Sequence, residues 1–193
     1  MRHFIYFSRT AQTSGNFDIH ELQKAGRMDI AVHNIIQAFF LSRTFREDVR
    51  LHMIFYGMPD PPKHLEMQVT PDLEISKKDV ASLIKKMLYK YKEGRKVEVF
   101  PKCFIEKKSL LKVIEELKKE GNEIYILDKE GEDIRTAKIG KEPSFIFGDH
   151  KGLPKKELKR LKQMATPVSV GPKMYFASQV VVIVNNELDR RED

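Results

Sequence analysis

The chain has a single cysteine, Cys103, among its 193 residues. This excludes an internal disulfide and a cysteine-based metal cluster and fits a reducing compartment, so we expect Cys103 to fill a small space in the core. No apolar run approaches the ~18 residues of a membrane-spanning helix, and the first residues lack the pattern of a signal peptide. We therefore expect a cytoplasmic protein that is neither inserted into a membrane nor secreted.

Several signatures of catalysis and nucleotide binding are also missing. The six histidines show no H-x₃-H or H-E-x-x-H spacing, so we expect no metal site. There is no G-x-S-x-G turn, and Cys103 has no positioned partner, which argues against a covalent nucleophile. Neither G-x-G-x-x-G nor G-x-x-x-x-G-K-[ST] occurs, so a glycine-rich phosphate loop is excluded as the way to hold a nucleotide.

Positive charge, by contrast, is abundant. Lysine and arginine number 35 against 28 aspartates and glutamates, for a net charge of +7 and a pI near 9.3. This excess favours a polyanionic partner, because basic side chains that bind phosphates release counterions. A solvated Lys/Glu-rich surface of a heat-tolerant protein is the alternative. With 41% hydrophobic and 33% charged residues, residues 1–193 are predicted to form one soluble domain.

Hydrophobic periodicity predicts strands that alternate with helices. Strands are expected where short apolar runs end at breakers, and helices where apolar residues recur every three or four positions. The expected strands are 2–7, 49–56, 65–69, 97–105, 123–127 and 145–147. The expected helices are 29–43, 77–92, 109–120 and 155–164. This alternation is typical of an α/β fold with a largely parallel sheet.

The segment 176–188 fits two structures. Its five consecutive β-branched residues, 180–184, favour a strand. Its apolar residues also recur at helical spacing, and the residues that follow favour a helix, so local patterns leave the choice open.

Two apolar runs in the last quarter of the chain each stop at a glycine, Phe145–Gly148 and Pro167–Gly171. A buried strand that ends in a tight turn has this pattern, and ligands of open α/β sheets bind beyond such carboxyl ends. A pocket here would hold its ligand by backbone groups and apolar walls, as suits an adenosine. Ordinary strand-ending turns explain the same pattern.

A second group of polar residues surrounds the predicted start of a helix at Asp29. Asp29 stands where an N-cap or first-turn acid belongs, with His33 one turn later and Arg27 just outside the helix. Arg43 and Arg46 follow, and guanidinium groups bind phosphates in bidentate geometry. A salt-bridged helix end that uses the acids at 47 and 48 is the alternative.

Five short segments together are similar to one known family. They are Gly26-Arg27-Met28-Asp29, Ala38-Phe39-Phe40-Leu41-Ser42, Arg46-Glu47-Asp48-Val49, Phe147-Gly148-Asp149-His150 and Asn186-Glu187-Leu188-Asp189. In this order the chain resembles, over nearly its whole length, the archaeal tRNA pseudouridine N1-methyltransferases of the SPOUT superfamily. The resemblance implies methyl transfer from S-adenosylmethionine, without a metal, to the pseudouridine at position 54 in the tRNA T loop.

The resemblance also implies a fold that periodicity does not predict. The C-terminal part of the α/β sheet would be threaded into a deep trefoil knot, a rare topology, and 176–188 would be its final helix. Enzymes of this superfamily are homodimers with the active site at the subunit interface. We therefore expect tRNA and a second copy of the chain as partners.

The family's S-adenosylmethionine pocket falls on two strand ends, one loop and the last helix. Leu127 and Gly148 end the strands, and Val180 stands where many relatives carry a cysteine, which argues against thiol chemistry. The loop consists of Ser169, Val170, Gly171, Pro172, Lys173, Met174 and Tyr175.

The implied reaction needs the acceptor nitrogen, the methyl carbon and the sulfur in line. It also needs a group that takes the N1 proton or stabilises the developing charge. Asp29 is the first candidate, with Arg27 holding the ring. Asp149, at the edge of the cofactor, is the second.

Arg43 and Arg46 are expected to bind the RNA backbone, and the basic helix 155–162 would extend that surface. His33 stands where several relatives carry arginine, so its phosphate contact is open. One alternative is methylation of pseudouridine in small-subunit rRNA by related ribosome-assembly enzymes, although the chain lacks a large insertion for rRNA. Another is a basic RNA-binding protein without catalysis.

Overall fold

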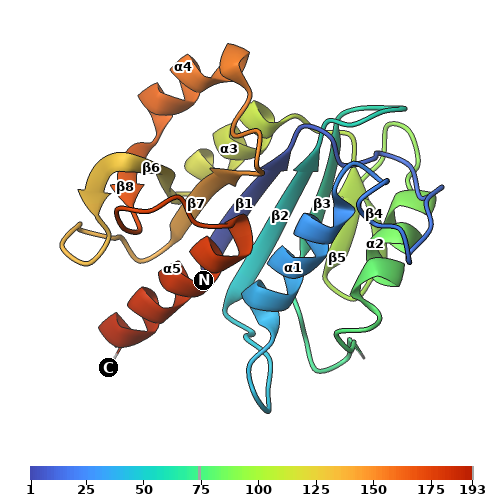
Figure 1. The fold of residues 1–193 in the computed structure, drawn as a ribbon, viewed down its shortest axis with the longest axis horizontal. Coiled ribbons are helices and arrows are strands. Elements are labelled where there is room, and N and C mark those ends of the chain that lie inside the picture. Colours follow the sequence, from blue (N-terminus) through green and yellow to red (C-terminus); the bar gives the residue numbers. More distant parts are fainter. Residues whose placement is uncertain (74, 193) are drawn as a thin grey trace.

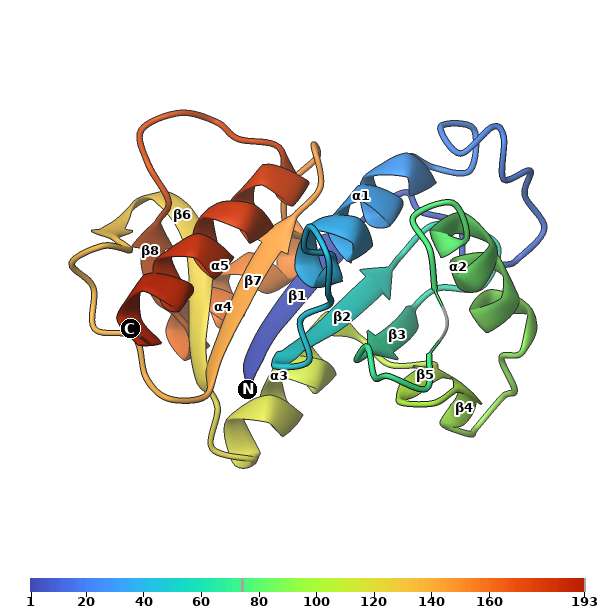
Figure 2. The same ribbon diagram turned by 90° about the horizontal axis from the view of Figure 1, so that it is seen from below.

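The computed structural model describes residues 1–73 and 75–192, which form one eight-stranded sheet with helices on both faces (Figures 1 and 2). The strands are β1 (Arg2–Ser8), β2 (Val49–Phe55), β3 (Lys63–Met67), β4 (Val97–Phe100), β5 (Cys103–Glu106), β6 (Glu123–Asp133), β7 (Pro143–Gly148) and β8 (Thr166–Ser169). The helices are α1 (Met28–Phe39), α2 (Val80–Tyr89), α3 (Leu110–Lys119), α4 (Lys155–Met164) and α5 (Ala177–Glu192).

The strand order is β4-β5-β3-β2-β1-β7-β6-β8. From β2 to β8 all neighbouring strands are parallel, whereas β3, β5 and β4 join as an antiparallel edge. The predicted α/β fold is confirmed, and the sheet is mixed. The single strand expected over 97–105 is wrong, because the chain reverses at Lys102, whose φ is 58°, to form the β4–β5 hairpin. Because apolar residues continue on both sides of this turn, the hydrophobic pattern does not reveal it.

Both faces of the central strands are buried, which explains the unbroken apolar run at the start of the chain. Phe4 and Tyr6 point to the face covered by α1, α2 and α5, and Ile5 and Phe7 point to the face covered by α3 and α4. Figure 2 shows α1 and α5 side by side on the first face. No helix of the described residues is long and apolar enough to cross a membrane.

The segment with the ambiguous pattern is helical, as α5. Val181, Val184 and Leu188 form its buried stripe within the core that includes α1. This packing outweighs the strand propensity of the β-branched run, because tertiary burial stabilises a segment more than its intrinsic preference. The helix implied by the family resemblance is therefore confirmed.

Candidate active site

The carboxyl ends of β1 and β7 lie together at one edge of the sheet. Phe7 pairs with Gly148, and the next backbone N–H, that of Asp149, donates to the Phe7 carbonyl at 3.0 Å. The chain turns sharply here: a Cβ on Gly148 would lie 2.6 Å from the carbonyl carbon of Gly152, so a side chain has no room. The glycine turn thus sets Asp149 against the end of β1.

Three donors fix the Asp149 carboxylate, which is 7% exposed. The Ser8 hydroxyl donates to Oδ2 at 2.8 Å, the Arg9 backbone N–H donates to Oδ2 at 3.2 Å, and the Lys151 N–H donates to Oδ1 at 2.8 Å. Ser8 belongs to no motif of the sequence. Its signal is positional: a serine that ends a buried strand at the ligand-binding edge of a parallel sheet.

The Tyr6 phenol lies in the same neighbourhood and is fully buried. Its hydroxyl has no hydrogen-bond partner among the described residues. Burial, and then the negative charge of Asp149, raise the pKa of Tyr6, and the charges of Asp29 and Arg27 also act on it. The charges of the two predicted catalytic acids and of the arginine therefore all act on one buried phenol.

Arg27 and Asp29 form a bidentate ion pair where α1 begins. The Nε and Nη2 atoms of Arg27 donate to Oδ1 and Oδ2 of Asp29 at 3.0 and 2.9 Å. This hydrogen bonding lowers the pKa of Asp29, and the charge of His33 one turn later adds a smaller effect. Asp29 is a first-turn acid, as expected, while the N-cap position belongs to Arg27, in left-handed backbone with φ 64°.

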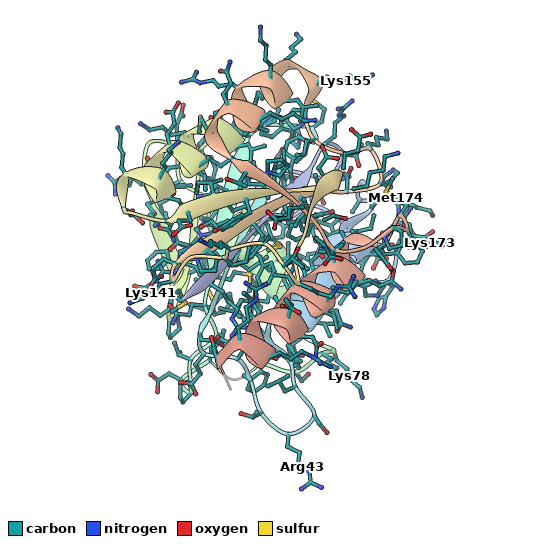
Figure 3. The ribbon with its side chains drawn as sticks, turned by 90° about the vertical axis from the view of Figure 1, so that its left-hand side faces the viewer. Arg43, Lys78, Lys141, Lys155, Lys173 and Met174 are labelled. Carbon is teal, nitrogen blue, oxygen red and sulfur yellow. The ribbon has the colours of Figure 1, made fainter. Side chains whose placement is uncertain are left out.

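The structure separates the other two arginines from this pair by the whole of α1, which is about 18 Å long. Figure 3 shows Arg43 at the tip of the loop that follows the helix. Arg46 instead donates to both carboxylate oxygens of Asp189 on α5, at 2.7 and 2.5 Å. Arg46 is therefore ion-paired, as the salt-bridge alternative predicts, but its partner is Asp189 and not one of the acids at 47 and 48. Contact of Arg43, Arg46 and the exposed His33 with RNA stays a prediction.

The residues predicted to bind the cofactor lie along neighbouring strands. Leu127 pairs with Val168, next to Ser169, and β6 pairs on its other side with β7, which ends at Gly148. Leu127 does not end its strand as expected: after a register shift β6 continues to Asp133. The strand pairing still brings the three predicted places to adjacent positions.

The loop after β8 has an apolar inner side. Gly171, with φ 138°, makes the turn, and the ring of Tyr175 folds back over it. Val170 and Tyr175, like Leu127, are half-buried against the core, and Val180 is buried on α5. Pro172, Lys173 and Met174 are exposed, and Figure 3 shows the last two at the surface. Binding of S-adenosylmethionine by these residues stays a prediction.

A cluster that could suggest a metal centre lies on the antiparallel side. Ligand atoms of His52, His64 and Glu66 lie within 4.8 Å of one another. Hydrogen bonds already occupy these atoms, within the cluster and outside it. His52 Nδ1 is 2.9 Å from His64 Nε2, and Glu66 accepts from Lys96 at 2.6 Å. We interpret the two histidines as part of a hydrogen-bonded chain. They come from the neighbouring strands β2 and β3, at a spacing that matches no metal-binding motif.

Comparison with known proteins identifies the family of this chain. A sequence model for the family described as "Putative SAM-dependent RNA methyltransferase" matches residues 1–193. The curated tRNA (pseudouridine(54)-N(1))-methyltransferases of Methanococcoides burtonii and Thermococcus kodakarensis are each 34% identical to this chain, over 98% of it and over 96% and 99% of their own lengths.

A solved structure supports the fold independently. The crystal structure of Archaeoglobus fulgidus Nep1 bound to S-adenosylhomocysteine matches 99% of each chain with a TM-score of 0.66, at 14% sequence identity. The full-length family match, the two archaeal relatives and this shared fold agree, and the chain therefore belongs to the family of SAM-dependent RNA methyltransferases.

Proposed function

We propose that this protein transfers a methyl group from S-adenosylmethionine to N1 of the pseudouridine at position 54 in the T loop of tRNA. The curated relatives named for this reaction align over nearly the whole chain. The observation that carries the proposal is a pair of carboxylates held by hydrogen bonds, Asp29 by Arg27 at the start of α1 and Asp149 by Ser8 at the end of β1. These are the anionic acceptors and the cationic donor that the reaction needs, at the ligand-binding edge of the sheet.

The residues of the glycine turns and the loop after β8 would hold S-adenosylmethionine. Leu127, Val170 and Tyr175 would form the apolar walls around the adenosine, and backbone groups beside Gly148 and Gly171 would supply the polar contacts. Bound there, S-adenosylmethionine supplies an electrophilic methyl group. Val180, buried on α5, has no reactive group, consistent with direct transfer to the base.

Asp29 would accept the N1 proton. Its lowered pKa makes it a weak base in isolation, yet N1 becomes strongly acidic as the new N–C bond forms, so an anionic carboxylate at hydrogen-bond distance suffices. Arg27 would orient Asp29 and hold the ring carbonyl groups. Asp149, fixed by the Ser8 hydroxyl and two backbone donors, is the second candidate for the proton.

We further propose that the domain, residues 1–193, is threaded as a SPOUT-type trefoil knot and works as a homodimer with the active site at the interface. The supporting features are the order β7-β6-β8, followed by the return of α5 to pack on α1. Met174 and Phe176, 91% and 78% exposed, would be covered by a second copy. Arg43, Arg46, His33 and the lysines of α4 would bind tRNA, in the cytoplasm.

Labelled S-adenosylmethionine and a tRNA transcript that carries pseudouridine at position 54 test this function. We expect methylation at N1, none on a transcript with uridine at that position, and loss of transfer in the Asp29→Ala and Arg27→Ala variants. Undiminished transfer in those variants would remove the assigned roles. Methylation confined to a small-subunit rRNA fragment would instead support the rRNA alternative. No heat on calorimetric titration with S-adenosylmethionine would support a protein that only binds RNA.

A further inference from the structure

A second concave site lies between the loop that precedes α1 and the outer side of α2. It is a cavity of about 760 Å³, and none of the proposed catalytic or cofactor-binding residues lines it. Five of its lining residues are aromatic or basic, Phe17, His20, Lys85, Lys86 and Tyr89, and one, Asp18, is acidic.

Tyr89 offers an aromatic surface that is fixed in place. Its side chain is 59% exposed at the end of α2. Part of its ring rests on the backbone of Gly15, where an added Cβ would lie 2.6 Å from Cδ2 of Tyr89. The ring is thus supported by the loop and remains accessible, which is the arrangement of a stacking platform for an unpaired base.

Lys85 places an ammonium group between the two rings of the groove. Its Nζ donates to the carbonyl oxygen of Phe17 at 2.5 Å and lies 5.6 and 6.0 Å from the ring centroids of Phe17 and Tyr89. Lys86 lines the same cavity. A base stacked on Tyr89 would therefore lie beside cationic groups that can bind its phosphates.

The charge of the surrounding segment favours RNA. Residues 76–95 contain seven basic and two acidic residues, a net charge of five out of the +7 of the whole chain. Within the described residues none of these seven pairs with an acid at 4.0 Å or less. On α4 two of the five basic residues, Arg160 and Lys162, are paired with Glu115 and Asp128. The charge near the groove therefore remains available to a polyanion.

We propose that this groove binds an unpaired nucleotide of the RNA substrate, with the base stacked on Tyr89 and the phosphates beside Lys85 and Lys86. The proposal rests on the proposed function for the identity of the RNA. The loop that lines the groove runs through Gly26 into Arg27 and the first turn of α1 (Figure 2). The groove therefore borders the segment of the chain that leads directly into Arg27 and Asp29.

Binding of pseudouridine-54 tRNA transcript, measured by fluorescence anisotropy at fixed salt, tests the groove. Stacking of one base predicts that Tyr89→Ala raises Kd roughly 5- to 150-fold, while Tyr89→Phe keeps the wild-type value. KM for tRNA should rise with kcat retained, since the groove does not touch the reacting atoms. Lys86→Ala should lower the slope of log Kd against log salt by about one, and Lys141→Ala, a matched charge change at the amino end of β7, should not.

Titration with S-adenosylmethionine separates this proposal from the proposed function. Tyr89→Ala should bind the methyl donor as the wild type does, which shows that the fold is intact. If Tyr89→Ala also binds tRNA as tightly as an active wild type, the groove proposal is overturned and the proposed function stands. A wild type that transfers no methyl group overturns the proposed function, while a weakened RNA affinity of Tyr89→Ala would still support the groove.

Discussion

The Nδ1 atom of His52 lies 2.9 Å from the Nε2 atom of His64, in the middle of a hydrogen-bonded chain that crosses four strands. His3 Nδ1 lies 3.1 Å from His52 Nε2 at one end, and His64 Nδ1 lies 3.0 Å from Glu106 Oε1 at the other. Burial raises the pKa of Glu106, but hydrogen bonds from His64 and Lys108 outweigh it and bring the pKa to about 2. Because this carboxylate accepts, His64 donates to it through Nδ1. In neutral rings, Nε2 of His64 and of His52 then accept from Nδ1 of His52 and of His3.

This chain predicts a steep loss of stability in mild acid. Burial lowers the pKa of His3 to about 4, and burial likewise lowers the pKa of His52 and His64. Neighbouring Arg50, Lys96 and Lys108 add to this, whereas Glu66 and Glu106 oppose it. The contribution of these rings to the free energy of unfolding is therefore fully present above their unfolded pKa of about 6.5. It is lost as the pH falls toward their lower pKa values in the folded protein. Up to three protons taken up on unfolding give a slope of about 4 kcal/mol per pH unit.

Urea unfolding curves between pH 7.5 and 5 measure this slope. His64→Gln removes one titrating ring and should reduce the proton uptake by about one, whatever it does to stability at pH 7.5. His33→Gln, at an exposed position on α1, is the matched control for replacing a histidine by glutamine. Equal slopes in all three proteins would contradict the neutral chain.

The Arg27–Asp29 ion pair predicts a change in the pH dependence of methyl transfer. In Arg27→Ala the hydrogen bonds that lower the pKa of Asp29 are lost, so that pKa rises. The wild type keeps Asp29 anionic to lower pH, and the acidic limb of kcat/KM should therefore shift to higher pH in the variant. We also expect kcat to fall by about 10²-fold or more. A reduced rate with an unshifted limb would show that Arg27 acts on the substrate and not through Asp29.

Two glycines with the same φ allow the cost of backbone strain to be distinguished from the cost of steric contact. Gly26 and Gly94 both have φ 69°, but an added Cβ would lie 1.7 Å from the Thr10 carbonyl oxygen at Gly26 and would meet nothing within 4 Å at Gly94. Gly94→Ala should cost about 1 kcal/mol, the strain of left-handed backbone. Gly26→Ala should cost more than about 4 kcal/mol or displace the loop before α1. Thermal and urea denaturation of the two variants measure the difference, and similar losses would be inconsistent with close packing at Thr10.

Asp189 connects the start of the chain to its last helix. Its carboxylate accepts from Arg2, which is 3% exposed, and from Arg46. Asp189→Ala should lower the free energy of unfolding by about 1–3 kcal/mol, because both guanidinium groups lose an anionic partner. Glu187→Ala, on the same helix, breaks only a pair with Arg191 one turn away and should cost less than about 0.5 kcal/mol. Urea unfolding compares them, and equal losses would argue against a structural role for Asp189.

Local sequence patterns predict the structural features that depend on residues close together in the chain. The bounds of α4 follow from periodicity, and Asp29 is placed in a first turn because helix starts have local signals. Arg27 and Asp29 are only two residues apart, so one short sequence motif contains both members of the ion pair. The family resemblance supplies the helix at 176–188, where packing against α1 outweighs local preference.

Contacts between distant segments cannot be predicted from local sequence patterns. Ser8 and Asp149 are 141 residues apart and meet only because β1 and β7 pair. Arg43 looks close to Arg27 in sequence, yet the length of α1 separates them. The histidine chain has no spacing motif because each ring comes from a different strand. These relationships follow from strand order, which periodicity does not determine.

The position of β1 in the middle of the sheet has a consequence for synthesis on the ribosome. Residues 2–106 supply β1, β2, β3, β5 and β4, so one half of the sheet can form early. The other side of β1 must wait for β7, about 40 residues later, or about 2 to 8 seconds at ordinary rates of translation. During that interval Phe4-Ile5-Tyr6-Phe7 is an apolar edge strand, the kind of segment that chaperones bind and that nascent chains use to aggregate.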